Sequence, residues 1–344
     1  MTSARMIRFA ALAAVVVVWL SVAMFRVGAS RAADSGSGAP LDGVDCTLTG
    51  TDPGLNTGKA ATNDYTANGS AQSTFITPTG ASNQLWLYYP NPYGITQGSG
   101  SIDMSYTGAG SFGWAGSLSG LNTAGVVAYP NISYGRSLFS GNGPEGQPPQ
   151  FPVNVSNTTS MPIDVAYTFS DSEMEAHNID VLFDEWVTTA PDTLYTDIGN
   201  WLEVGIFPYF SFQGGYAGTL IKTFVEPVTL NGTSTTISFY EYSANSGTCS
   251  NDQCGQAVFF YAVPEQNVAS GEIAFDMLDF IKEAITTSGI TALNYVQAHQ
   301  LGTELGGSAD QDFSFTMSKF GFSVVPQVCP TATATSTATP TPAA

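Results

Sequence analysis

Hydrophobic and polar residues alternate along much of the chain, and turn residues separate the alternating segments. In residues 202–207, aliphatic side chains occupy every second position. Residues 179–184 show the same period, and residues 313–324 show it on both sides of a break at residues 318–319. A period of two is typical of strands in antiparallel sheets that bury one face. Together with 36 glycines and many turn residues, it predicts an all-β sandwich or barrel.

One segment has a helical period instead. Ile273, Met277 and Ile281 recur every four residues in residues 270–289, which begin with a serine suited to an N-cap and end with a glycine. The pattern predicts a single amphipathic helix over 270–289. We expect Met277 and Ile281 to pack against the back of a sheet.

The chain divides into four parts by composition. Residues 1–33 combine arginines, a 17-residue apolar run over 9–25 and small residues, which is the order of a secretory signal. The run is also just long enough for an N-terminal membrane anchor, so cleavage and anchoring both stay open. Residues 34–59 form a Ser/Gly/Pro-rich lead-in, 60–328 a single domain, and 329–344 a Pro/Thr-rich tail. Either fate of the first segment places the domain outside the cytoplasm.

The charge excludes some partners. The chain has 9 basic and 28 acidic residues, a net charge of −19. Without residues 1–33, which carry four of the basic and none of the acidic residues, the charge is −23. Such a surface repels phosphate, which argues against nucleic acid and anionic lipid headgroups as partners. Because only 11% of residues are charged and 43% are hydrophobic, the chain has material for a large core, and we expect a folded monomer.

An exported domain is expected to oxidise its cysteines. The chain has four of them, Cys46, Cys249, Cys254 and Cys329. A Cys249–Cys254 bond would close a short turn, and a Cys46–Cys329 bond would tie the ends of the domain together, but other pairings stay open. A metal site is not expected, because His177 and His299 are the only histidines.

The candidate chemistry rests on carboxylates. The sequence has no Gly-rich phosphate loop and no convincing Ser-His-Asp set. Glu203 would point out of the sheet if the aliphatic face of its strand is buried, and Gly205 leaves room beside it. Glu304 lies among glycines that permit close approach of the backbone. Solvated strand acids are the alternative interpretation, whereas two such acids facing each other would suit a glycosidase.

An ordered series of motifs supports the second interpretation. It consists of Asn83-Gln84-Leu85-Trp86, Tyr129-Pro130-Asn131, Ile179-Asp180-Val181, Glu203-Val204-Gly205-Ile206-Phe207, the helix, and Gly302-Thr303-Glu304. This series resembles glycoside hydrolase family 12, which contains endo-β-1,4-glucanases and xyloglucanases. The resemblance covers roughly residues 60–325, and it implies a β-jelly roll of two antiparallel sheets with an open cleft.

The resemblance also implies roles for individual residues. Glu203 stands at the family's nucleophile, Glu304 at its acid/base, and Asp180 at the aspartate that hydrogen-bonds the nucleophile. Trp86 matches a tryptophan that stacks on a glucose ring, and Asn83 precedes it in the same motif.

Further aromatic residues are candidates for the cleft lining. Trp114 and Tyr129 could offer flat platforms to pyranose rings, with core packing as the alternative for Trp114. Phe207 stands where the family has Trp, and Gly205 where it has Met. These departures affect the cleft lining and the substrate preference more than the two carboxylates.

The expected function is that of a secreted, retaining endo-β-1,4-glucanase that acts on β-glucan polysaccharides and uses no cofactor. The alternatives are a carbohydrate-binding or lectin-like surface protein on the same sandwich, and a secreted structural surface protein. A Gly/Pro-rich loop over residues 141–160 would influence which β-glucan is preferred.

Overall fold

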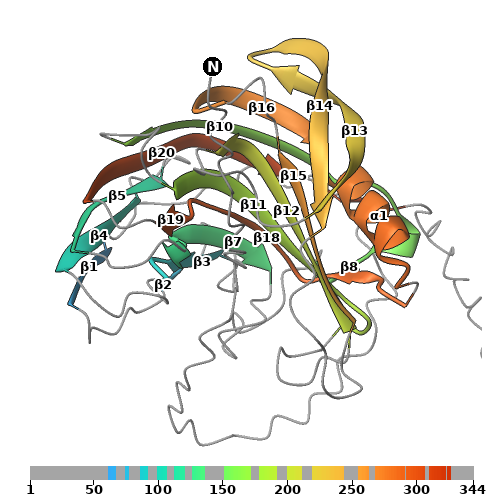
Figure 1. Ribbon diagram of the computed structural model, residues 1–344, viewed down its shortest axis with the longest axis horizontal. Coiled ribbons are helices and arrows are strands. Elements are labelled where there is room, and N and C mark those ends of the chain that lie inside the picture. The colour runs from blue at the N-terminus through green and yellow to red at the C-terminus, as the bar shows by residue number, and fades with distance from the viewer. Residues whose placement is uncertain are drawn as a thin grey trace, which may run out of the picture.

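The structure is a computed structural model. It describes residues 61–66, 74–76, 86–91, 99–106, 112–120, 126–135, 151–171, 178–191, 200–210, 219–243, 255–262, 268–290, 292–306, 310–322 and 324–326. Within this described part, 19 strands form one hydrogen-bonded network that folds into two facing layers (Figure 1). The predicted all-β jelly roll of antiparallel strands is confirmed.

The first layer, the outer sheet, contains six strands in the spatial order β1-β4-β5-β20-β10-β16. They are β1 (Ala61–Thr66), β4 (Ser99–Tyr106), β5 (Phe112–Ser119), β20 (Gln311–Phe322), β10 (Pro162–Asp171) and β16 (Ser270–Asp276). All neighbours in this layer are antiparallel.

The second layer, the inner sheet, is centred on β11 (Asn178–Thr188) and β12 (Asn200–Phe210). Beyond β12 lies β15 (Gly255–Ala262), paired in parallel, and beyond β11 lie three short strands in succession, β17 (Tyr295–Val296), β18 (Ala298–Gly302) and β19 (Leu305–Gly306). The remaining strands of the layer are β6 (Val126–Ala128), β7 (Asn131–Gly135), β8 (Val153–Asn154), β3 (Trp86–Tyr89) and β2 (Thr74–Ile76).

Two smaller units complete the fold. The hairpin of β13 (Thr219–Leu230) and β14 (Thr233–Ser243) joins the two layers, because β13 pairs with the end of β16 and β14 pairs with β15. A short 3-10 helix, η1 (Val155–Asn157), precedes β9 (Thr158–Ser160), which pairs with β21 (Val325–Pro326). Residues 151–160 of the loop expected over 141–160 therefore contain β8, η1 and β9, and residues 141–150 lie outside the described part.

The core lies between the two layers, as the alternation predicts. Leu202, Val204 and Ile206 of β12 are fully buried in it, together with Val181 and Phe183 of β11. On β20, Phe313, Phe315 and Met317 enter the core from one side of the break and Phe320 and Phe322 from the other. The register of β20 against β10 shifts by one residue at Ser318, a β-bulge that explains why the hydrophobic pattern changes phase there.

The helix is shorter than predicted. Residues 270–276 form β16, and α1 (Met277–Ser288) begins at Asp276, whose carboxylate accepts the Leu278 N–H at 3.0 Å as an N-cap. The predicted end is confirmed, because Gly289 adopts a left-handed conformation with φ of 70° after the last turn. Met277 and Ile281 are fully buried, as expected.

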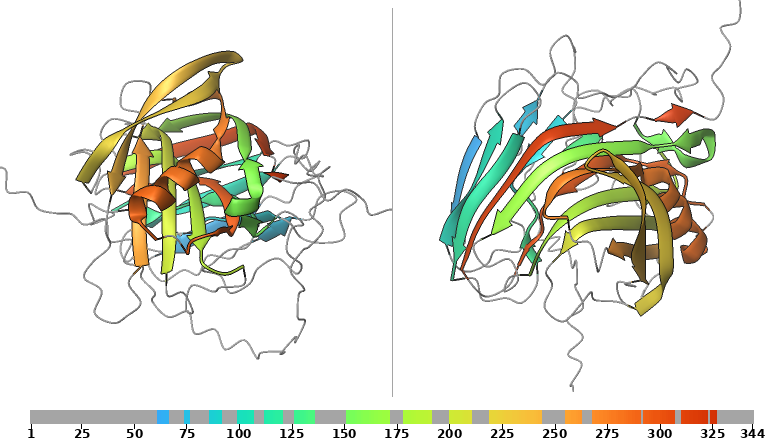
Figure 2. Two further views of the ribbon diagram at one scale, coloured as in Figure 1. Left: turned by 90° about the vertical axis from the view of Figure 1, so that its right-hand side faces the viewer. Right: turned by 90° about the horizontal axis from the view of Figure 1, so that it is seen from above.

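In Figure 2 the helix lies across one end of the sandwich. No helix in the described part of the chain is both long and apolar enough to span a bilayer.

Candidate active site

Strand β12 presents Glu203 on the face of the inner sheet that is turned away from the core. Because Leu202 and Val204 point into the core, alternation turns Glu203 to the opposite face, as predicted. In the register of β11 against β12, Glu203 lies opposite Trp186 and Gly205 lies opposite Asp184. Asp184 and Glu203 are therefore diagonal neighbours on one face, close enough for their side chains to interact.

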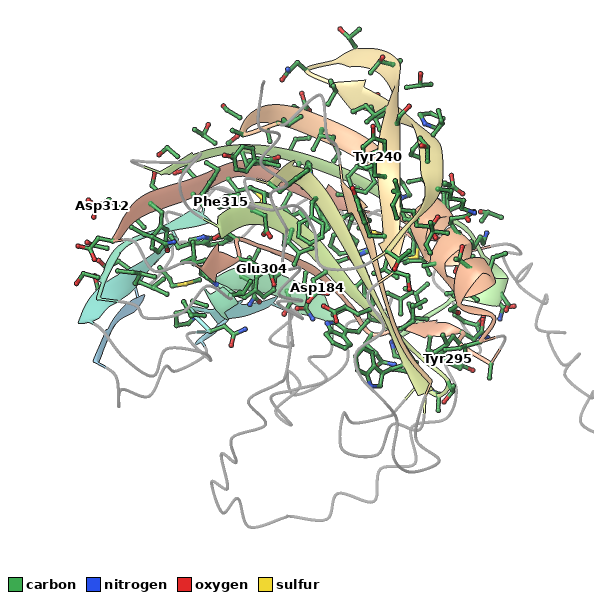
Figure 3. The ribbon with its side chains drawn as sticks, in the orientation of Figure 1. Asp184, Tyr240, Tyr295, Glu304, Asp312 and Phe315 are labelled. Carbon is green, nitrogen blue, oxygen red and sulfur yellow. The ribbon has the colours of Figure 1, made fainter. Side chains whose placement is uncertain are left out.

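Glu304 reaches the same region from the other side of β11. It follows β18 and is held by two backbone-directed hydrogen bonds to one residue: its N–H donates to Asp180 Oδ1 at 3.0 Å, and its carbonyl oxygen accepts the Asp180 N–H at 3.2 Å. Figure 3 shows Glu304 and Asp184 near each other below the inner sheet, and their charges interact. Glu203 and Glu304, about a hundred residues apart in the chain, also interact electrostatically.

We call Asp180, Asp184, Glu203 and Glu304 the carboxylate cluster. Asp180 is fully buried, Asp184 is 7% exposed and Glu203 is 5% exposed. No lysine or arginine of the described part forms an ion pair with any of the four. Four acids are thus held together without a balancing cation among the described residues.

This environment raises the pKa of every member of the cluster. Burial raises the pKa of Glu304 to about 7, and its hydrogen bond with Asp180 opposes the shift. For Glu203, burial raises the pKa, and the charges of Asp184 and Glu304 raise it further. Burial also raises the pKa of Asp184, whose Oδ2 accepts a hydrogen bond from Trp186 Nε1 at 3.1 Å that favours ionisation. The cluster therefore retains protons at pH values where ordinary carboxylates are ionised.

The position expected for Asp180 is corrected. It was expected beside Glu203, but its described hydrogen bonds join it to Glu304, and Asp184 lies beside Glu203 instead. A local motif could have identified Asp184. Residues Phe183-Asp184-Glu185-Trp186 have the order aromatic-Asp-x-Trp, and they lie on the strand that pairs with the strand of Glu203. Sequence reasoning missed Asp184 and its partner Trp186.

Two aromatic residues expected to bind sugar have other partners. Trp114 belongs to the core, where its ring stacks on Phe315 with centroids 4.4 Å apart and its Nε1 donates to Thr303 Oγ1 at 2.8 Å. Tyr129 is 6% exposed, and its hydroxyl donates to the carbonyl of Leu182 at 3.2 Å. Neither ring face is free for a pyranose. Trp114 instead contacts Thr303, the residue before Glu304, and Tyr129 contacts β11.

Of the remaining predicted site residues, only some lie in the described part of the chain. Phe207 lies on the Glu203 face of β12 and is 1% exposed. Trp86 lies in β3, but its side chain falls outside the described part, as do Asn83 and all four cysteines with both predicted disulfides. A buried pair of tryptophans was not predicted: Trp186 and Trp201 lie on the same face as Glu203, with ring centroids 4.8 Å apart.

Two cavities, of about 570 and 300 Å³, lie elsewhere. Both are lined by residues of α1, including Lys282 and Thr286, and neither is lined by a member of the carboxylate cluster. The smaller cavity also contacts Glu226 of the β13–β14 hairpin. The acids that line the smaller cavity, Glu226, Asp279 and Glu283, come from the hairpin and from α1.

The cluster contains the elements of two-carboxylate chemistry. Glu203 and Glu304 approach one region from different strands, and an acid with a pKa near 7 can donate a proton near neutral pH. A second carboxylate nearby can attack or stabilise a positive centre.

Solved structures share this fold. The family 12 xyloglucanase from Bacillus licheniformis, in complex with ligand, superposes with a TM-score of 0.58 at 17% identity and covers 78% of this chain and 100% of its own. A metagenome-derived glycoside hydrolase family 12 endoglucanase gives 0.54 at 16% identity, covering 78% of this chain and 99% of its own. The family 12 endoglucanase 3 of Trichoderma harzianum gives 0.50 at 17% identity, with 74% and 98% covered.

No family model matches the sequence, and no curated protein matches it. The resemblance expected from the motifs is thus confirmed at the level of the fold, which is that of glycoside hydrolase family 12 structures.

Proposed function

We propose that the chain is a retaining glycoside hydrolase that cleaves internal β-1,4-glucosidic bonds of a β-glucan. The observation that carries the proposal is the pair Glu203 and Glu304, which interact electrostatically although about a hundred residues separate them in the chain. The shared fold adds to it, because xyloglucanases and endoglucanases are among the solved structures of similar shape. Cellulose, mixed-linkage β-glucan and xyloglucan are the candidate substrates.

In the first step, the Glu203 carboxylate attacks the anomeric carbon while Glu304 donates its proton to the leaving glycosidic oxygen. The raised pKa of Glu304 keeps this proton in place up to about pH 7. The charge of Asp184 raises the pKa of Glu203, so a proton held on Asp184 leaves the negative charge on Glu203.

In the second step, Glu304, now ionised, removes a proton from water, and the water oxygen attacks the anomeric carbon of the glycosyl–Glu203 ester. The bond to Glu203 breaks, its carboxylate is restored and Glu304 regains its proton. Two inversions give net retention of configuration. No cofactor takes part in this scheme.

We also propose export, on the basis of residues 1–33, with the domain either released or anchored at the outer face of the membrane. The order of arginines, apolar run and small residues supports a cleaved signal, whereas the length of the run would also permit an anchor. N-terminal sequencing of the protein recovered from the medium distinguishes the two.

The test of the activity is release of reducing ends from carboxymethyl cellulose, mixed-linkage β-glucan and xyloglucan. The wild-type chain should hydrolyse at least one of them, and Glu203→Gln and Glu304→Gln should each reduce the rate by at least about a thousandfold. Asp312→Asn, at an exposed position of β20, is the matched control. Hydrolysis that survives both glutamate substitutions rejects the assignment, and binding without hydrolysis favours the lectin-like alternative.

A further inference from the structure

A second acid–base pair lies on the other face of β11. Glu185 and His299 are both fully buried, and Glu185 Oε1 lies 2.8 Å from His299 Nδ1. The imidazole meets the edges of two aromatic rings, Phe151 at 5.0 Å and Phe322 at 5.2 Å between centroids. Polar groups that are buried among apolar side chains cost folding free energy unless they are hydrogen-bonded.

Burial disfavours the charged form of both groups. Burial lowers the pKa of His299 to about 3, so the ring is uncharged above that pH. Burial raises the pKa of Glu185 well above its usual range, and a hydrogen bond from the Gln300 N–H opposes the shift. One hydrogen therefore joins the pair, either from the carboxylic acid to the ring nitrogen or from the ring N–H to the carboxyl oxygen.

The pair lies at an irregularity in the sheet. Strand β11 pairs with β18 at Phe183 and Leu301 and with β17 at Val187 and Val296. The two paired positions are four residues apart on β11 but five residues apart on the partner segment. The extra residue makes a bulge opposite Glu185. At this bulge the Gln297 N–H donates to the carbonyl of Trp186 at 3.0 Å.

The bulge lies directly behind the carboxylate cluster. Asp184 and Trp186, the two neighbours of Glu185, are joined by a hydrogen bond on the opposite face of β11, next to Glu203. His299 begins the run that leads through β18 to Glu304 five residues later. A link between Glu185 and His299 therefore holds the strand carrying Asp184 against the strand that leads to Glu304.

We propose that Glu185 and His299 are positioning residues, which fix the bulge between β11 and β18 and thereby set the placement of Glu304 relative to Asp184 and Glu203. The inference rests on the proposed hydrolase activity and deepens it. A buried polar pair is a poor means of adding stability, because apolar residues of similar volume often serve as well or better. The directional hydrogen bond between Glu185 and His299 adds to what the hydrophobic pattern already specifies, and selects one register at the bulge.

The test compares kcat, KM and melting temperature of six variants on a soluble β-glucan that the wild-type chain hydrolyses. Glu185→Gln keeps the length and can still exchange a hydrogen bond with His299. Glu185→Asp keeps the acid but is one methylene too short, and Glu185→Leu keeps the volume without polar atoms. Glu241→Leu is the control, because Glu241 is a fully buried glutamate of β14 that contacts none of the cluster.

We expect the Asp and Leu variants to lose about ten- to a hundredfold in kcat with little change in KM, as a small displacement of catalytic groups does. The Gln variant should retain most of the kcat, and Glu241→Leu should change melting temperature alone. His299→Leu combined with Glu185→Leu should lose no more than either single variant, because the two residues act as one unit.

Equal kcat for the Gln and Asp variants, or a Leu variant that loses only melting temperature, overturns the inference while the hydrolase assignment stands. If Glu185→Leu does not fold, the comparison of Gln with Asp decides. A wild-type chain that hydrolyses none of the β-glucans rejects the proposed function and the inference together.

Discussion

Glu241 beside α1 and the carboxylate cluster are buried acids with different charged neighbours. Beside α1, Glu241 lies 3.8 Å from Lys222, which also pairs with Glu283, and Lys282 of the same helix donates to the carbonyl of Thr158 at 3.4 Å. In the carboxylate cluster, by contrast, the described part of the chain supplies no cation.

The difference separates acids that support the fold from acids suited to chemistry. An ammonium group beside a carboxylate favours its charged form: Lys222 lowers the pKa of Glu241 and so opposes the larger upward shift caused by burial. A carboxylate whose neighbours are other carboxylates has a raised pKa and can gain or lose a proton near neutral pH, which serves acid–base catalysis. All three lysines of the described part, Lys222, Lys282 and Lys319, contact residues outside the cluster.

The largest loss of activity is expected when one acid of the carboxylate cluster is neutralised. Asp184→Asn should lower kcat by about a hundred- to a thousandfold, because Glu203 loses the neighbour that can hold the shared proton. Melting temperature should hold or rise, since one repelling charge disappears from a buried site. The measurement is steady-state hydrolysis of β-glucan with a thermal melt. A kcat within about twofold of the wild type would remove Asp184 from the mechanism.

A second experiment follows the proton of Glu304. Because Glu304 must be protonated to act as an acid and burial raises its pKa to about 7, kcat/KM should fall about tenfold per pH unit above pH 7. The measurement is a pH–rate profile from pH 4 to 9, with a melt at each pH to exclude unfolding. An alkaline limb that begins only above pH 9 would contradict this assignment of the acid.

A third experiment concerns Glu226, a buried acid beside α1 without a lysine partner among its described contacts. Burial raises its pKa to about 8, and the charges of Asp279 and Asp276 add to the shift. The folded state thus binds a proton more tightly than the unfolded state, so stability is greatest below about pH 4.5 and is lost as the pH rises through 8. Glu226→Gln should raise the melting temperature at pH 9 by about 2–4 °C. The same substitution should change the melting temperature little at pH 4. A rise in melting temperature at pH 4 as large as that at pH 9 would contradict the link between the raised pKa of Glu226 and stability.

The smallest effect is expected at Lys222. Its side chain is 45% exposed, so water screens its attraction to Glu241 and Glu283, and Lys222→Met should cost less than about 1 kcal/mol of unfolding free energy. Urea denaturation in low and high salt measures the loss, which should shrink as salt is added. The kcat should stay unchanged, since Lys222 contacts none of the carboxylate cluster.

Local patterns in the sequence predicted the sheet and the face of β12 on which Glu203 lies. Alternation in β12 correctly turned Glu203 away from the core, because strand periodicity depends on neighbouring residues alone. The start of the helix was wrong for a related reason: residues four apart satisfy a period of two as well as a period of 3.6. Ile273 fits both patterns, and Phe275 two positions later assigns it to a strand.

Contacts between distant segments could not be read in this way. Trp114 donates its indole N–H to Thr303, 189 residues away, so a core tryptophan and a sugar platform look alike in the sequence. The positions of Asp180 and Asp184 depend on a register shift of β11 against β12 between Val181 and Phe183, which no local pattern predicts.

The position of β10 constrains how the chain can be shortened. This strand, residues 162–171, is flanked by β16 and β20, which lie about a hundred and a hundred and fifty residues later. The sandwich therefore cannot close before the segment ending at Phe322 is available, and a fragment that stops ahead of β20 would expose both β10 and β5 as open edges prone to association. Such long-range pairing also places folding in the slow, millisecond-to-second range of β proteins. A minimal version of this protein should be trimmed from its low-complexity ends inward, never from within the sandwich.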